Sequence, residues 1–318
     1  MSAIDWSPQQ ADLLFMSNRE GNGEIYLLRP GDDEWINLSR NPGGDNWAEW
    51  SPDGSRIAFQ SGRDGKLDIW VMDADGSNQR RLTDHPDHDY LPAWTPDGAR
   101  IAFTSWRAEP VESGSEDSDT DELDKESREA GEPAGKMPPK QAEEERSPHI
   151  YIMNADGSGQ RRLLKEPLGT SAGANFSPDG SLIVFSRKMG ERPSDLFLAD
   201  AEGTILRRLT DEERSNSASR FSPDGSLIAF YSDDGDTSRI EVIRPDGSGR
   251  RVIVGEGKNW YPTWSPDGRW LLFTAAPDPD NLDDLNLYMV PLDASSLPQP
   301  IVQSPGRQAE GRWRPWPR

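Results

Sequence analysis

Short apolar runs separated by turn residues recur along the whole chain. The runs read IAF, IVF or LLF in one phrase and IWVM, IYIM or LFLA in another, and Ser-Pro-Asp-Gly or Asp-Gly-Ser stands between them. Short runs of β-branched and aromatic residues bounded by Pro, Asp and Gly are typical of β-strands joined by tight turns. The pattern therefore predicts an all-β protein.

One longer phrase repeats. It reads WSPDGSRIAF from Trp50, WTPDGARIAF from Trp94, FSPDGSLIVF from Phe176, FSPDGSLIAF from Phe221 and WSPDGRWLLF from Trp264, with a degenerate copy, WSPQQADLLF, from Trp6. These anchors lie 44, 44, 82, 45 and 43 residues apart, and the 82 is one repeat of 44 plus an insertion of 38. A period of about 40–45 residues is typical of propeller blades. Six anchors predict a six-bladed β-propeller, residues 1–318, as a single domain.

Each repeat predicts a blade of four antiparallel strands. The inner strand ends at the anchor aromatic, which we expect to pack between blades, and SPDG turns the chain into the IAF-type strand. The second phrase, such as DIWVMDADGSNQRRLT, supplies the third and fourth strands. A further segment, AEGRWRPW, lies 49 residues beyond Trp264 and predicts ring closure by pairing of the N- and C-terminal strands. Seven candidate inner strands for six blades leave one redundant.

The meander also predicts two different faces. The SPDG and DADGS turns lie on one face, here called the turn face, and the connections from second to third and from fourth to first strands lie on the other, the loop face. Residues 108–147 interrupt the third blade on the loop face with fourteen Asp or Glu and five Lys or Arg. So little apolar area predicts a disordered acidic insertion.

Composition narrows the classes of partner. The formal net charge of −21 repels phosphate backbones and anionic membrane surfaces, so nucleic acid is not expected as a partner. The chain has no cysteine, which excludes disulfides and thiol chemistry, and no apolar run long enough for a transmembrane segment. Its first residues, MSAIDWSPQQ, lack the features of a signal peptide.

The tandem phrases W-S-P-D-G-x-x-I-A-F and I-Y-x-M-x-x-D-G-S resemble the WD40-like propeller repeat (PD40) of the TolB propeller and its relatives. TolB also carries an α/β domain before its propeller, whereas the repeats here begin at Trp6, so the resemblance is to the propeller alone. It implies a non-enzymatic module, monomeric, that docks a protein or peptide partner in a cell-envelope complex. A periplasmic location follows from the resemblance, and a cytoplasmic one from the missing signal peptide; both stay open.

Loop position gives the expected partner-binding residues. Variable loops of a propeller gather around one mouth of its tunnel, which is the default binding site. On the loop face these are Asp45, Asn46, His85, His88, Asp89, Tyr90, Asn216, Asn259 and Trp260.

Calcium is a possible ligand of the acidic loops on the same face. Oxygen-rich loops that converge near an axis suit a hard cation. The candidate carboxylates are Asp64, Asp233, Asp236 and Asp280. The sequences DADG and NADG at Asp73 and Asn154 lack the rest of an EF-hand and are predicted to be hairpin turns.

Two other functions stay open. His85 and His88 stand among aspartates and suit a metal- and carbohydrate-binding propeller, with a polysaccharide lyase as one such function, although lyases of this type use several His and the chain has three. Related propellers also precede hydrolase domains, so the chain could be a propeller domain trimmed from a larger hydrolase. It contains no G-x-S-x-G nucleophile motif of its own, and no catalytic residue is predicted.

Overall fold

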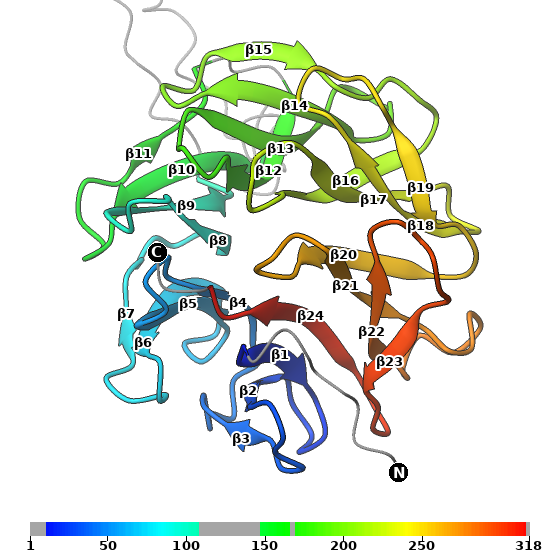
Figure 1. Ribbon diagram of the computed structural model, residues 1–318. Coiled ribbons are helices and arrows are strands. Elements are labelled where there is room, and N and C mark those ends of the chain that lie inside the picture. Colours follow the sequence, from blue (N-terminus) through cyan, green and yellow to red (C-terminus); the bar gives the residue numbers. More distant parts are fainter. Residues whose placement is uncertain (1–10, 108–146, 166–168, 316–318) are drawn as a thin grey trace, which may run out of the picture.

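The computed structural model describes residues 11–107, 147–165 and 169–315, and in these ranges the chain forms 24 strands in six four-stranded sheets (Figure 1). The sheets stand around a common axis as the blades of a propeller, which confirms the predicted all-β, six-bladed fold. A helix long and apolar enough to cross a membrane is not found within the described ranges.

Every blade is an antiparallel meander from the axis outward, and neighbouring blades follow one another along the chain. Blade 1 contains β24 (Gln308–Trp313), β1 (Leu13–Ser17), β2 (Glu24–Leu28) and β3 (Ile36–Asn37); blade 2 contains β4 (Asp45–Trp50), β5 (Arg56–Ser61), β6 (Asp68–Asp73) and β7 (Arg80–Arg81). Blade 3 contains β8 (Asp89–Trp94), β9 (Arg100–Ser105), β10 (His149–Asn154) and β11 (Arg161–Arg162).

The remaining three blades have longer outer strands. Blade 4 contains β12 (Thr170–Phe176), β13 (Leu182–Lys188), β14 (Asp195–Asp200) and β15 (Ile205–Arg208). Blade 5 contains β16 (Ser215–Phe221), β17 (Ile228–Asp233), β18 (Ser238–Ile243) and β19 (Arg251–Val254). Blade 6 contains β20 (Asn259–Trp264), β21 (Trp270–Ala275), β22 (Asn286–Pro291) and β23 (Gln299–Val302).

The two ends of the chain close the ring. The C-terminal strand β24 pairs antiparallel with β1, with Leu13 opposite Trp313, and becomes the innermost strand of blade 1. The segment AEGRWRPW thus supplies the inner strand of the first blade, as its anchor-like sequence indicates. The competing copy at Trp6 lies outside the described residues.

The SPDG turns owe their shape to a hydroxyl and a carboxylate. In blade 2, Ser51 Oγ donates to Asp53 Oδ1 at 2.6 Å and accepts from the Arg56 amide at 2.9 Å, while Gly54 takes a φ of +67°. The same hydroxyl–carboxylate pair recurs in blades 3 to 6. These bonds lower the pKa of Asp53 and of Asp179 to about 2. The turn aspartates therefore stay charged at neutral pH.

The hydrophobic core lies between the blades. Trp50 packs with Leu14 and Ile25 of blade 1 and with Ile57 and Phe59 of its own blade. Five further clusters fill the other five interfaces in the same way. The expected packing of the anchor aromatics between neighbouring blades is confirmed.

The loop face is recognisable beside the acidic insertion. The Trp106 amide, just after β9, donates to the His88 carbonyl at 3.1 Å, so the end of β9 meets the connection between β7 and β8. The residues of the insertion at 108–146 lie outside the described residues, and their predicted disorder stays a prediction.

Candidate functional site: the axial tunnel

All six inner strands carry an irregularity at the same level. Each has one residue with a left-handed backbone, at φ between +52° and +68°, next to a register shift. These residues are Trp47, Leu91, Gly173, Ala218, Tyr261 and Glu310. A left-handed backbone is costly for large side chains, so bulges of this kind occur where they direct a group toward a site. Here they form a ring around the tunnel, which we call the bulge ring.

Side-chain size around the bulge ring decides where the tunnel is hollow. Trp47 and Tyr261 touch edge to face at 4.9 Å between ring centroids, and Tyr231 meets Tyr261 at 5.7 Å. To the bulge ring itself blades 4 and 5 contribute only the small residues Gly173 and Ala218. The unequal sizes leave a cavity of about 210 Å³, here called the small cavity, lined by these residues and by Arg220.

A charged cluster crosses the tunnel two residues further along the strands, toward the turn face. Glu49 Oε1 accepts a hydrogen bond from Arg312 Nε at 2.6 Å and is also paired with Arg220 Nη2. Glu49 belongs to blade 2 and Arg220 to blade 5, so their pair connects opposite sides of the six-membered ring (Figure 1). This axial cluster separates the small cavity from the turn face.

A larger cavity of about 530 Å³ lies between the axial cluster and the turn face. Every blade gives it one proline, and most blades give it the anchor aromatic. The prolines are Pro52, Pro96, Pro178, Pro223, Pro266 and Pro315, and the aromatics are Trp50, Phe176, Phe221, Trp264 and Trp313. We call it the proline-ringed cavity. Its ionisable lining residues are Glu49, Arg220 and Arg312.

Burial changes the electrostatics of the bulge ring and of the axial cluster. Burial raises the pKa of Glu310 to about 7. The Trp47 amide, which donates to Glu310 Oε2 at 2.7 Å, and the charge of Arg312 both lower this pKa but do not offset the effect of burial. Burial and the charge of Arg312 lower the pKa of Arg220 to about 10. Both shifts follow from the same cause, the removal of charged groups from water inside the tunnel.

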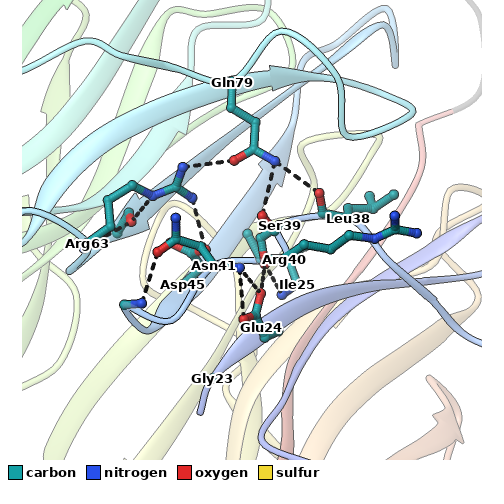
Figure 2. A network of polar contacts seen from close by, with 12 residues as sticks. Gly23, Glu24, Ile25, Leu38, Ser39, Arg40, Asn41, Asp45, Arg63 and Gln79 are labelled. Atoms are coloured by element: carbon teal, nitrogen blue, oxygen red, sulfur yellow. Dashed lines mark hydrogen bonds and ion pairs between the residues drawn. The ribbon is translucent and has the colours of Figure 1, made fainter. Parts of the chain in front are cut away.

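Two of the predicted binding residues are buried in ion pairs within their blades, and a glutamine connects each pair to the neighbouring blade. Asp45 accepts from Arg63 Nη2 at 2.9 Å; Arg63 Nη1 donates to Gln79, whose amide reaches the Leu38 carbonyl of blade 1 at 3.0 Å (Figure 2). Asp89, Arg107 and Gln160 repeat this arrangement between blades 3 and 2. Burial raises the pKa of Asp45 above its ordinary value, although the hydrogen bonds of Ser61 and Arg63 and the charge of Arg63 oppose this shift. Each aspartate thus holds the arginine that orients the glutamine between neighbouring blades.

The predicted asparagines and aromatics lie at the beginnings of the inner strands, before the bulge ring. Asn216 and Asn259 are buried, and their amides donate to the carbonyls of Arg214 at 2.9 Å and Ser238 at 3.0 Å. Asn46, Tyr90 and Trp260 are partly exposed. The lining of neither tunnel cavity includes any of the nine predicted residues. As partner-binding residues they stay a prediction.

The two histidines lie in the connection before β8, and their Nδ1 atoms accept hydrogen bonds from two different backbone amides. His88 is exposed, and its Nδ1 accepts from the Leu67 amide at 3.0 Å. His85 Nδ1 accepts from the Asp87 amide at 3.2 Å.

The four candidate calcium ligands are spread over three blades. Asp64 pairs with Arg81 at 2.9 Å, and Asp233 bonds Ser238 and the Gly235 amide, while Asp236 and Asp280 are exposed. Among the described residues, no three His, Cys, Asp or Glu side chains gather as a metal site would require. Calcium binding stays a prediction.

The axial cluster was not predicted, although the repeat contains a signal for it. Successive side chains of a strand point to opposite faces. Since the anchor aromatic packs between blades, the residue before it points to the other side of the strand, and five of these six residues line the proline-ringed cavity. The six are Glu49, Ala93, Asn175, Arg220, Thr263 and Arg312, and the opposite charges of Glu49 and Arg220 stand three blades apart. Reading the repeats in register identifies the pair.

Fold and tunnel together define a six-bladed β-propeller whose axial tunnel is divided into two cavities. The chain belongs to the TolB beta propeller domain family, whose match covers residues 1–133 and 131–316. An uncharacterized protein of Agrobacterium fabrum is 28% identical over 146 residues, 45% of this chain and 45% of that protein. The matched segment thus spans less than half of that curated relative.

Several solved structures share the fold. TolB from Acinetobacter baumannii matches with a TM-score of 0.70 at 16% identity, over 96% of this chain and 67% of that one. The putative TolB from Agrobacterium tumefaciens matches with a TM-score of 0.66 at 18% identity, over 98% of this chain and 100% of that one. An oligogalacturonate lyase from Vibrio parahaemolyticus matches with a TM-score of 0.58 at 17% identity, over 92% of this chain and 74% of that one. At these identities the likeness shows the fold alone.

Proposed function

We propose that this chain is a non-enzymatic binding module that takes a segment of a partner protein into the proline-ringed cavity. The observation that carries the proposal is the cavity itself, about 530 Å³ at the axis, with a proline from every blade. Proline and packed aromatic side chains lose little freedom on binding, so a site built from them is preorganised. The TolB relatives support a docking role for the propeller.

The chemistry of the cavity favours binding over catalysis. Its ionisable lining groups pair with one another, and its remaining surface is mostly proline and aromatic. A nucleophile with a neighbouring base, which hydrolysis would need, is not among these lining residues. The lyase alternative is supported by the likeness in fold to the oligogalacturonate lyase. Among the described residues, no group of three His, Cys, Asp or Glu side chains that could hold a metal supports it further.

Photo-crosslinking tests the position of the site. p-Benzoyl-phenylalanine is placed at Pro223, on the rim of the cavity, or at Pro86, an exposed residue of the loop face, and each protein is irradiated with an extract of its own organism. A protein adduct from position 223 is expected, and Pro266→Trp, which narrows the cavity, should abolish it. Adducts from position 86 alone would move the partner to the loop face. Adducts from neither position would contradict the proposed function.

A further inference from the structure

The axial cluster holds more positive than negative charge. Glu49 Oε1 is shared by Arg220 and Arg312, so two guanidinium groups face one carboxylate. Arg312 Nη1 donates to the Gly311 carbonyl at 2.9 Å, and in the described part of the chain no hydrogen bond is found for Arg312 Nη2 or for Arg220 Nη1. Both arginines line the proline-ringed cavity. Guanidinium groups with unused donors inside a cavity are suited to bind a carboxylate.

The shape of the cavity selects the end of a chain. Because Arg220 and Glu49 meet across the axis, the cavity is closed at its floor and open at the turn face. An internal segment of a partner would have to enter and turn back within about 530 Å³. A chain terminus can enter end-on, and a C-terminus places its carboxylate at the floor. Capture of a terminal carboxylate is a known mode of peptide recognition.

The rim has the opposite charge. A groove of about 360 Å³ between blades 2 and 3 shares Pro52 and Pro96 with the cavity and is lined by Asp53, Asp97 and Arg56. Hydrogen bonds from Ser51 and Thr95 lower the pKa of the two aspartates, so both are charged at neutral pH. Arg56 lies against Trp94, 4.8 Å from its ring centroid. The groove therefore favours a cationic side chain.

The distance from floor to rim fixes the spacing of the two charges. Glu49 lies at the floor, and Asp53, four residues later on the same strand and its turn, lies at the rim. At about 3.3 Å per residue this is at most roughly 13 Å. An extended peptide covers the same distance in three or four residues.

We propose that the proline-ringed cavity receives the C-terminus of a partner polypeptide. Its terminal carboxylate binds Arg220 and Arg312, and a lysine or arginine three or four residues earlier binds Asp53 and Asp97. The inference rests on the proposed function and specifies its partner by chemistry.

Fluorescence anisotropy with two matched peptides tests the carboxylate. The probe is fluorescein-Gly-Gly-Lys-Lys-Ala-Ala-Ala with a free C-terminus, and its control is the same peptide as the C-terminal amide. The free acid is expected to bind at least tenfold more tightly than the amide. Replacing both lysines by glutamate should weaken the acid by a similar factor. Equal affinity of acid and amide, or binding of neither, would overturn the inference.

Three variants locate the effect and separate it from misfolding. Arg220→Gln should remove the preference for the acid, whereas Glu49→Gln, which deletes the competing carboxylate, should tighten acid binding several-fold and leave the amide unchanged. A folding defect cannot produce such a gain. The exposed Arg192→Gln, on the loop face, is the matched control and should change neither peptide. If Glu49→Gln gives no gain while position 223 still crosslinks a partner, the inference fails and the proposed function stands.

Discussion

Glu310 shows what the tunnel does to a single side chain. It is 7% exposed on the innermost strand of blade 1, and burial raises its pKa to about 7 from 4.5. Between these two pH values the native state binds a proton that the unfolded chain has already lost. The free energy of unfolding therefore falls as the pH rises through this window.

Glu310→Gln should remove this pH dependence. The two pKa values differ by about 2.5 units, which corresponds to about 3 kcal/mol. We expect the variant to match the parent protein at pH 4.5 or below and to exceed its stability by up to about 3 kcal/mol at pH 8. Urea unfolding at several pH values measures the difference. The exposed Glu202→Gln is the control, and parallel curves for Glu310→Gln and the parent would contradict the assignment.

At the scale of the strand and its turn, one position between neighbouring blades has room only for the hydrogen atom of a glycine. The turn between β14 and β15 brings Gly203 against blade 3, where a Cβ would stand 1.9 Å from the Leu163 carbonyl oxygen. Gly247 occupies the same turn of blade 5, with a φ of +87° against +80° for Gly203, but nothing lies within 4 Å of its Cβ position. The two glycines share backbone strain and differ in contact.

The pair allows strain and contact to be separated. Gly247→Ala should cost about 1–2 kcal/mol, because a left-handed backbone disfavours any side chain. Gly203→Ala should cost a further 1–3 kcal/mol, because the methyl group displaces blade 3. Urea unfolding of the two variants gives the difference directly. Equal losses would mean that the interface yields without cost.

The blades could be predicted from the sequence, and the bulge ring could not. Strand order and blade number follow from phrases that repeat, since SPDG turns and anchor aromatics have the same local cause in every copy. The bulge positions hold residues of six different types, so no local sequence signal marks them, and we attribute their left-handed backbone to the closing of the ring. They are Trp47, Leu91, Gly173, Ala218, Tyr261 and Glu310. The axial cluster joins residues 171 and 263 positions apart, so only aligned repeats place them together.

The binding residues were expected on the loop face because variable loops gather there. In the structure Asp45 and Asp89, which begin two inner strands, are buried and paired with Arg63 and Arg107 of their own blades. A buried aspartate with a distant arginine partner cannot be told from an exposed loop aspartate by local sequence. The two cavities, in contrast, are formed by strand residues that the loop argument does not consider.

On the scale of the whole molecule, β24 closes the ring. Removing residues 308–318 would expose the edge of β1, take Trp313 from the interface of blades 6 and 1, and leave Glu49 without Arg312. Such losses are large against the 5–15 kcal/mol that stabilises a typical domain. The shortened chain should therefore lose near-ultraviolet circular dichroism and aggregate. Removing residues 316–318 alone is the control, and an unchanged melting temperature after the longer deletion would contradict closure by β24.

The net charge of −21 also makes cation binding a property of the whole molecule to be tested. A calcium site occupied at 100 times its Kd would raise the free energy of unfolding by about 2.7 kcal/mol. Thermal melts in calcium or EDTA, with calorimetric titration, measure this. If the predicted loops bind calcium, Asp233→Asn should abolish the shift. A shift that magnesium reproduces in full would indicate charge screening rather than a site.

Arg220 gives the two ends of the propeller a common element. Its side chain lines both the small cavity and the proline-ringed cavity and holds Glu49 across the axis. Any guest that draws this guanidinium toward one end takes it from the other. A guest in one cavity would then weaken binding in the other, and because coupling free energies are reciprocal the effect must be equal in both directions. The division of the tunnel thus couples its two cavities through a single arginine.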